Sequence, residues 1–163
     1  MGVSGCGKTT LGRALAVRWS VPFLDADTFH SPQARHSMSR GRPLSDTDRW
    51  PWLDRVAAGI KEQPTRRPAA CVVACSALKR AYRDRLERVG PICWVHPVGT
   101  VDLLKGRLER RAAIGRHFMP PGLLTSQLET LEPLGPSEWG VEVPLAEPVQ
   151  VQADHVAEVL GTG

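Results

Sequence analysis

A glycine-rich stretch at residues 2–9 constrains the fold of this chain more than any other feature. It matches the pattern G-x-x-x-x-G-K-[ST] with Gly2-Val3-Ser4-Gly5-Cys6-Gly7-Lys8-Thr9. Glycine adopts backbone angles that side chains disfavour, so successive N–H groups can turn inward toward an anion. The N-terminus of a following helix adds to the attraction for negative charge. The stretch therefore predicts a phosphate-binding loop that opens onto a helix.

The residues around this loop predict a nucleotide site. Lys8 supplies a cation for the β- and γ-phosphates, and the Thr9 hydroxyl can ligate Mg²⁺. Apolar residues then recur at helical spacing from Leu11 to Trp19. Cys6 lies inside the loop, and we expect its thiol to be exposed. The candidate cofactor-binding residues are Gly2, Ser4, Gly5, Cys6, Gly7, Lys8, Thr9 and Thr10.

The upstream side of the loop departs from the pattern. Such a loop follows a buried strand, and here only Met1 precedes Gly2. We therefore expect a sheet without its first strand, with a slot beside the strands that end at Asp25 and Cys75. Our hypothesis is that Met1 is an internal methionine and that an apolar segment precedes it in the complete reading frame.

Length and composition indicate one globular domain, residues 1–163, of ordinary apolar content at 42%. No apolar run approaches the ~20 residues of a membrane span, so we expect a cytoplasmic protein without a membrane partner. The net charge of +4 suits a polyanionic ligand such as ATP or a sugar acid. The arginines are spread along the chain, which does not favour nucleic-acid binding.

Short apolar runs alternate with helical patterns along the whole chain. The expected strands are residues 21–24, 71–75, 92–95 and 141–143. This order predicts an α/β fold of the P-loop NTPase class, a parallel sheet between two layers of helices. Asp25 and Asp27 follow the first of these strands, at the edge of the sheet where ligands gather. We expect one of them in the magnesium shell and the other at a substrate hydroxyl.

Local signals place the helix starts and a lid. Ser31 and Pro32 are typical of a helix N-terminus. Asp48 is a candidate cap for the next helix, with Pro51 in its first turn. The arginine-rich segment at about 110–122 is a candidate mobile lid, of the kind that kinases use to exclude water.

Five stretches together resemble gluconokinases of the thermoresistant type, small P-loop kinases related to shikimate kinase. They are MGVSGCGKTT (1–10), LDADTFHSP (24–32), GRPLSDTDRWPWL (41–53), VVACSALKRAYRDRL (72–86) and HFMPPGLLTSQLETLEP (117–133). The resemblance runs from the loop to about residue 133. It implies transfer of the γ-phosphoryl group of ATP to the 6-hydroxyl of D-gluconate, with Mg²⁺ as cofactor. It also implies a possible homodimer.

The same resemblance assigns roles to individual residues. Asp27 would accept the proton of the attacking hydroxyl and Asp25 would sit in the outer magnesium shell, although the two roles are interchangeable at this stage. Lys8, Arg107 and Arg111 would stabilise the phosphoryl group in transit, with Arg110 and Arg116 as competitors. Cations suit the gluconate carboxylate. The candidate gluconate-binding residues are Asp27, His30, Arg49, Lys79 and Arg83.

Two departures from the family pattern leave alternatives open. Arg111 is followed by extra residues before His117 and Phe118, which affects the lid geometry, and residues 137–151 match poorly. One alternative is a related kinase for another small acid, such as shikimate. The other is a non-catalytic nucleotide-binding protein that lacks the first strand.

Overall fold

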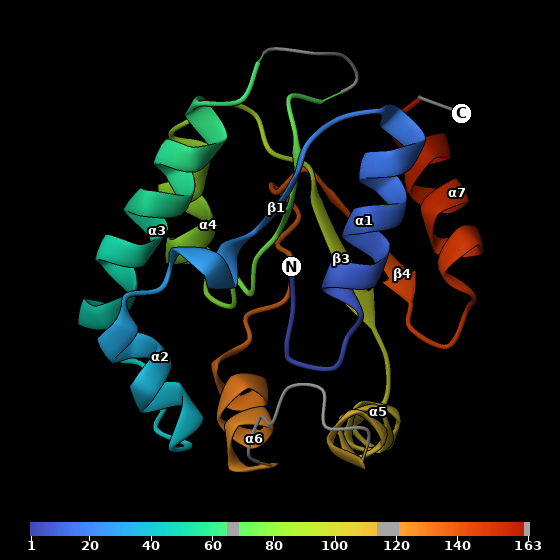
Figure 1. The fold of residues 1–163 in the computed structure, drawn as a ribbon. Coiled ribbons are helices and arrows are strands. Elements are labelled where there is room, and N and C mark those ends of the chain that lie inside the picture. Colours follow the sequence, from blue (N-terminus) through green and yellow to red (C-terminus); the bar gives the residue numbers. More distant parts are fainter. Residues whose placement is uncertain (65–68, 114–120, 162–163) are drawn as a thin grey trace.

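The structure is a computed structural model that describes residues 1–64, 69–113 and 121–161. Most of the expected lid, residues 114–120, lies outside the described residues. The chain alternates helices and strands, as expected from the sequence (Figure 1). The elements are α1 (Lys8–Trp19), β1 (Phe23–Asp25), η1 (Ala26–Phe29), α2 (Pro32–Ser39), α3 (Asp46–Lys61), β2 (Val72–Ala74), α4 (Arg80–Glu87), β3 (Trp94–Val98), α5 (Val101–Ala113), α6 (Pro121–Thr130), β4 (Gly140–Pro144) and α7 (Val149–Val159).

The strands form two parallel pairs. In one pair β1 lies beside β2, with Phe23 opposite Val72. In the other, β3 lies beside β4, with Trp94 opposite Gly140. Because each connection between paired strands carries at least one helix, the parallel arrangement predicted from the strand–helix order is confirmed.

Helices cover both faces of these strands. Figure 1 shows α3 and α4 on one side and α1 and α7 on the other. On the first side Trp52 and Val56 of α3 pack in one buried cluster with Tyr82 of α4. On the second, Leu11 of α1 packs with Val156 of α7. The predicted layered α/β architecture is therefore confirmed.

An apolar cavity of about 480 Å³ separates the two strand pairs. Val73 and Cys75 line it from the β2 side, and Val95 lines it from β3. At one end the Gly2 N–H donates to the Ser76 carbonyl at 2.9 Å, and the Met1 amino group donates to the Val95 carbonyl. Residues 1–2 thus connect the two pairs at the place where a slot was expected.

The start of α3 differs from the sequence-based expectation. Ser45, and not Asp48, caps this helix, because its Oγ accepts from the Asp48 N–H at 3.2 Å while the Asp48 carboxylate accepts from the Ser45 N–H at 3.0 Å. The helix therefore begins earlier, and Pro51 lies inside it and not in its first turn. The Ser31 prediction is confirmed, since its Oγ accepts from the Ala34 N–H at 3.1 Å.

The described helices do not resemble a membrane span. None of them is long and apolar enough to cross a bilayer.

Candidate active site

The glycine-rich stretch forms the predicted loop and leads directly into α1. Gly5 and Gly7 have φ values of 84° and 86°, in the left-handed region that side chains disfavour. Gly7 is also the residue that caps α1. The backbone of the loop therefore needs glycine at both positions, and the loop ends where α1 begins.

Lys8 bends back across this loop. Its Nζ donates to the Val3 carbonyl at 2.8 Å, and no carboxylate pairs with it in the described part of the chain. Thr9 and Thr10 are exposed on the first turn of α1. A cation without an acidic partner, beside exposed hydroxyls at a helix N-terminus, suits a polyphosphate with its metal ion.

Cys6 is placed differently from the expectation. Its side chain is 1% exposed and packs with Val3 and Leu104, so the expected exposure of the thiol is wrong. The residue lies in the loop sequence but faces the core. Its side chain therefore anchors the loop, and only its backbone remains as a candidate contact for phosphate.

The two aspartates after β1 do not continue the strand. Asp25 ends β1 and its Oδ1 accepts from the Asp27 N–H at 3.1 Å, which caps the short helix η1. Asp27 lies in η1 with a side chain that is 69% exposed. The chain turns between the two carboxylates, so each presents oxygen to a different position at this edge of the sheet.

His30 is buried below Asp27. Its ring is 5% exposed and stacks on Trp52 with a centroid distance of 4.4 Å. Burial and, less strongly, the guanidinium groups of Arg49, Arg55 and Arg35 lower the pKa of His30 to about 4. The ring is therefore neutral at pH 7. Its Nε2 lies 3.9 Å from the Asp27 Oδ1, while its buried Nδ1 has no hydrogen-bond partner among the described residues.

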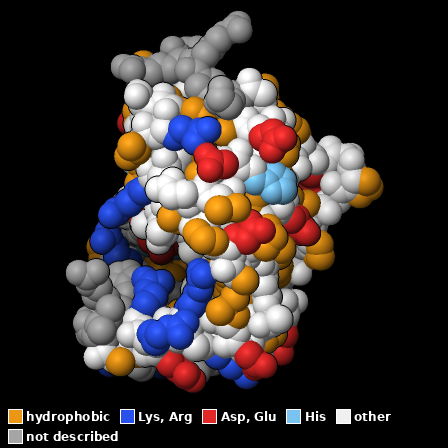
Figure 2. All heavy atoms as spheres, turned by 90° about the vertical axis from the view of Figure 1, so that its right-hand side faces the viewer, with side chains coloured by type: hydrophobic (Ala, Val, Ile, Leu, Met, Phe, Trp, Pro, Cys, Tyr) orange, Lys and Arg blue, Asp and Glu red, His pale blue; other side chains and the backbone are white. Residues whose placement is uncertain are grey.

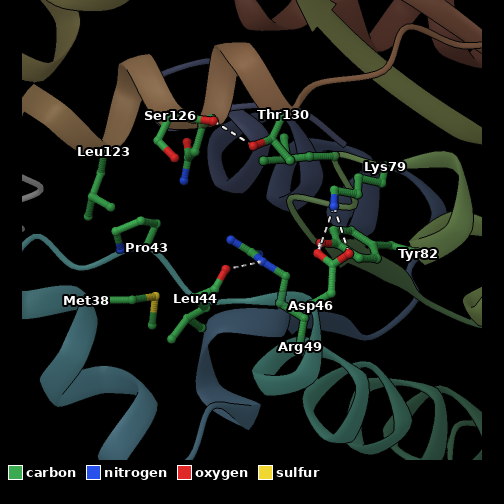
Figure 3. A pocket seen from close by; sticks show the side chains of 12 residues that line it. Met38, Pro43, Leu44, Asp46, Arg49, Lys79, Tyr82, Leu123, Ser126 and Thr130 are labelled. Carbon is green, nitrogen blue, oxygen red and sulfur yellow. Dashed lines mark hydrogen bonds and ion pairs between the residues drawn. The ribbon is translucent and has the colours of Figure 1, made fainter.

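A polar pocket of about 270 Å³ lies between the α2–α3 connection, the start of α4 and α6 (Figure 3). Figure 3 shows Arg49 of α3 pointing into this space, with Ser126 and Thr130 of α6 across from it. The Arg49 Nε donates to the Leu44 carbonyl at 3.3 Å, and its guanidinium lies 5.7 Å from the centre of the Tyr82 ring. The lining residues are Met38, Pro43, Leu44, Asp46, Arg49, Leu78, Lys79, Tyr82, Leu123, Ser126, Gln127 and Thr130.

An aspartate that the sequence reasoning missed organises one wall of this pocket. Both carboxylate oxygens of Asp46 accept from the Lys79 Nζ at 2.8 Å, and the Tyr82 hydroxyl also donates to Asp46. These contacts hold the pKa of Asp46 below its usual range. The Asp46 carboxylate thereby balances the charge of Lys79, whereas Arg49 makes no ion pair with a carboxylate in the described regions. The capping pair Ser45 and Asp48 was the signal that could have placed Asp46 at a helix start.

Arg83, a candidate for gluconate contact, is not among the residues that line the pocket. Its side chain is fully buried and its Nε donates to the Glu138 Oε1 at 2.5 Å. Its Nη1 and Nη2 groups donate to the carbonyl groups of Ala77, Leu78, Glu132 and Pro133. Since these contacts engage all three nitrogens within the protein, Arg83 joins α4 to the segment before β4.

Arg107 and Arg111, the arginines expected to stabilise the transferring phosphoryl group, occupy different positions on α5. The Arg107 Nη2 donates to the Leu145 carbonyl at 2.7 Å, and a side-chain carbon at Gly7 would lie 3.5 Å from its Nη1. Arg107 therefore lies against the phosphate loop. Arg111 is exposed on the last turn of α5, next to the residues that the structure does not describe.

The pocket and the loop are joined by Gln127 of α6, a second residue without a role in the sequence reasoning. Its Oε1 accepts from the Ser4 N–H at 2.7 Å. Gln127 also lines the pocket. A polar cavity thus adjoins a phosphate-binding loop, and its Arg49 makes no ion pair with any described carboxylate.

Comparison with known proteins agrees with this arrangement. The family model described as shikimate kinase matches residues 4–120. The gluconokinase of Gluconobacter oxydans (strain 621H) is 45% identical over 144 residues, which cover 88% of this chain and 79% of that protein. This chain belongs to the gluconokinase family. The thermoresistant gluconokinase of Escherichia coli (strain K12) is 34% identical over 166 residues, covering 100% of this chain and 92% of that protein.

A solved member of the gluconokinase family has the same fold. The crystal structure of a gluconokinase from Sinorhizobium meliloti 1021 superposes with a TM-score of 0.85 at 39% identity and covers 99% of this chain and 89% of that chain. The resemblance stated from the five sequence stretches is therefore confirmed. Membership of a kinase family also implies the use of ATP.

The charge on the surface is compatible with anionic ligands of a gluconokinase-family site. Figure 2 shows the face reached by turning the right-hand side of Figure 1 toward the viewer. Lys and Arg side chains gather at its lower left, around a hollow, while acidic side chains are scattered elsewhere on the face. This distribution attracts polyanions to one side of the molecule.

Proposed function

We propose that this chain transfers the γ-phosphoryl group of ATP to the 6-hydroxyl of D-gluconate and releases 6-phospho-D-gluconate. The observation that carries the proposal is the pocket that holds Arg49 and the Asp46–Lys79 pair next to the phosphate loop. Such a pocket suits a small acid that also carries hydroxyl groups. The curated relatives named gluconokinases support the same substrate.

The donor half of the reaction rests on the loop and α1. We propose that the loop amides and Lys8 hold the β- and γ-phosphates, with Thr10 close to them. The exposed Thr9 hydroxyl supplies the kind of hard oxygen ligand that Mg²⁺ prefers, and the Asp25 carboxylate offers oxygens to its outer shell, so these residues fit the ion. When bound, Mg²⁺ neutralises phosphate charge and orients the transferring group.

The acceptor half rests on the pocket. Arg49 binds the gluconate carboxylate, because its guanidinium points into the cavity without an acidic partner in the described structure. Lys79 and Asp46, which are paired with each other, offer a donor and an acceptor to substrate hydroxyls. His30 and Arg83 are not among the proposed contacts, because one is a buried neutral ring and the other a buried ion-pair partner.

Proton transfer and charge stabilisation complete the reaction. We propose that Asp27 accepts the proton of the 6-hydroxyl, because its carboxylate is exposed at the ligand-binding edge of the sheet. Arg107, which lies against the loop, stabilises the phosphoryl group in transit, and Arg111 joins it from the end of α5. The segment at about 110–122 acts as the lid of the single domain, residues 1–163.

The cellular location, the partners and the oligomeric state of the enzyme are also part of the proposed function. We propose a cytoplasmic protein that acts on a small molecule without a nucleic-acid or membrane partner. A homodimer is carried over from the resemblance alone. Sedimentation at several concentrations measures this oligomeric state directly.

A coupled assay of ADP release tests the substrate. The protein is supplied with ATP and Mg²⁺, and with D-gluconate, shikimate or D-glucitol in turn. We expect turnover with gluconate that exceeds turnover with the other two acceptors. Preference for shikimate would favour the related-kinase alternative, and ATP binding without any turnover would favour a non-catalytic nucleotide-binding protein.

A further inference from the structure

Gln127 on α6 is the one described side chain that both lines the acceptor pocket and bonds to the phosphate loop. Its Oε1 accepts from the Ser4 N–H at 2.7 Å. A glutamine amide carries an acceptor oxygen and a separate donor nitrogen. With the oxygen engaged by a backbone donor, the nitrogen is the group left for the pocket, and no hydrogen bond to Nε2 is found within the described residues.

The surrounding packing fixes α6 beside the loop. Leu124, one turn earlier on α6, is 2% exposed and lies in the same buried cluster as Val3 and Cys6 of the loop. Beyond the end of α6, the Glu132 N–H donates to the Leu78 carbonyl at 2.8 Å. The helix is therefore attached to the loop at one end and to the strand-to-helix connection before α4 at the other.

We propose that Gln127 is a positioning residue that aligns the acceptor hydroxyl with the phosphate loop. Its Oε1 holds the Ser4 N–H, and its Nε2 donates to an oxygen of the sugar acid in the pocket. This inference rests on the proposed function of the pocket. One amide contacts both the phosphate loop and the acceptor pocket. When the sugar acid binds in the pocket, this amide fixes the distance between the acceptor hydroxyl and the γ-phosphate, on which the rate depends steeply.

Two substitutions separate the two ends of the amide. In Gln127→Glu a carboxylate oxygen can still accept from the Ser4 N–H, but the donor to the pocket is lost. In Gln127→Leu both contacts are lost without adding charge. Glu129→Gln, an exposed position on the same helix, is the matched control.

Steady-state kinetics and ATP titration distinguish the variants. We expect Gln127→Leu to raise the gluconate KM by about tenfold, the value of one lost hydrogen bond of about 1.4 kcal/mol. Gln127→Glu should raise the KM at least as much, because its carboxylate also repels the gluconate anion. Both should also lower kcat, and Gln127→Leu should lower it further, by about tenfold or more, because it also releases the loop. Gln127→Glu should bind ATP within about twofold of wild type. A wild-type gluconate KM in Gln127→Glu, or a wild-type kcat in Gln127→Leu, would overturn the proposal.

A measurement without substrate keeps this inference separate from the proposed function. Hydrogen exchange of the Ser4 amide, followed by NMR in the unliganded protein, should accelerate in Gln127→Leu and stay near the wild-type rate in Gln127→Glu. Unchanged exchange in Gln127→Leu contradicts the loop contact whatever the substrate is. Failure of the wild-type protein to phosphorylate gluconate contradicts the proposed function and leaves the loop contact standing.

Discussion

Arg83 and Glu138 form a buried ion pair, with the Arg83 Nε donating to the Glu138 Oε1 at 2.5 Å and with side-chain exposures of 0% and 1%. The Glu138 carboxylate also accepts from the Gly135 N–H at 2.8 Å, and Arg83 holds its pKa below the usual range. The pair joins α4 to the turn before β4, behind the pocket and not in it. The contacts of Arg83 are therefore within the protein and away from the pocket.

Removing one partner of this pair should destabilise the protein strongly. Glu138→Leu leaves the Arg83 guanidinium buried without a counter-charge, and we expect a loss of about 3–5 kcal/mol in the free energy of unfolding. Urea denaturation measures the loss. At a temperature where the variant is folded, its gluconate KM should match wild type. An unchanged stability together with a raised KM would return Arg83 to the substrate site.

Lys8 and Asp27 should be essential for turnover but not for folding. Lys8→Ala removes the cation that faces the phosphates, and Asp27→Asn removes the proton acceptor, which typically contributes about 10²–10⁴-fold to the rate. Both side chains lie outside the buried clusters, so circular dichroism and the unfolding midpoint should stay close to wild type. Near wild-type activity with gluconate in either variant would refute its assigned role.

Arg49 should determine the preference for an acidic acceptor. Arg49→Met removes a charge-assisted contact of about 1.5–3 kcal/mol, so we expect the gluconate KM to rise by about 10- to 150-fold. Arg49→Lys keeps the charge but loses the fork geometry, so its gluconate KM should lie between the values of wild type and Arg49→Met. The comparison of gluconate with D-glucitol, which lacks the carboxylate, is the internal control. An unchanged preference for gluconate in Arg49→Met would contradict this role.

His30 should make the fold less stable in mild acid. Its pKa is about 4 in the folded protein and 6.5 in its ordinary state, so the unfolded chain binds the proton first as the pH falls. Stability should therefore be unaffected above about pH 6.5 and should fall by on the order of 3 kcal/mol as the pH drops from 6.5 to 4.

A phenylalanine substitution isolates this contribution. His30→Phe retains a ring that can stack on Trp52 but does not titrate. Its unfolding free energy should depend less steeply on pH between 6.5 and 4 than that of wild type. His96, whose pKa burial also lowers, contributes to both proteins and cancels in the comparison. Identical pH dependence in the two proteins would show that the His30 ring is accessible to protons.

The features that the sequence predicted correctly are local or periodic. The loop followed from the spacing of glycines that require positive φ, and the layered fold followed from apolar runs that alternate with helical patterns. The capping error at Asp48 arose because Ser45, three residues earlier, can form the same kind of bond and starts the helix first. Local propensity cannot rank two capping candidates that share one motif.

The contacts that the sequence did not predict join residues far apart in the chain. Asp46 meets Lys79 across 33 positions, and Ser4 meets Gln127 across 123. The burial of Arg83 depends on Glu138, which is 55 positions away. No spacing rule encodes such pairs, because they follow from the packing of α3, α4 and α6 around the strands. The sequence alone therefore could not distinguish Arg49 and Lys79, which line the pocket, from Arg83, which is buried in an ion pair.

The central claim is that the 6-hydroxyl of D-gluconate is the phosphoryl acceptor, and proton-coupled ³¹P NMR of the product tests it most directly. The protein is incubated with ATP, Mg²⁺ and D-gluconate, and the new phosphomonoester signal is recorded without proton decoupling. A phosphate on the 6-carbon couples to two methylene protons, so the account predicts a triplet. A doublet would place the phosphate on a secondary hydroxyl, and either that result or the absence of a new signal would contradict the account.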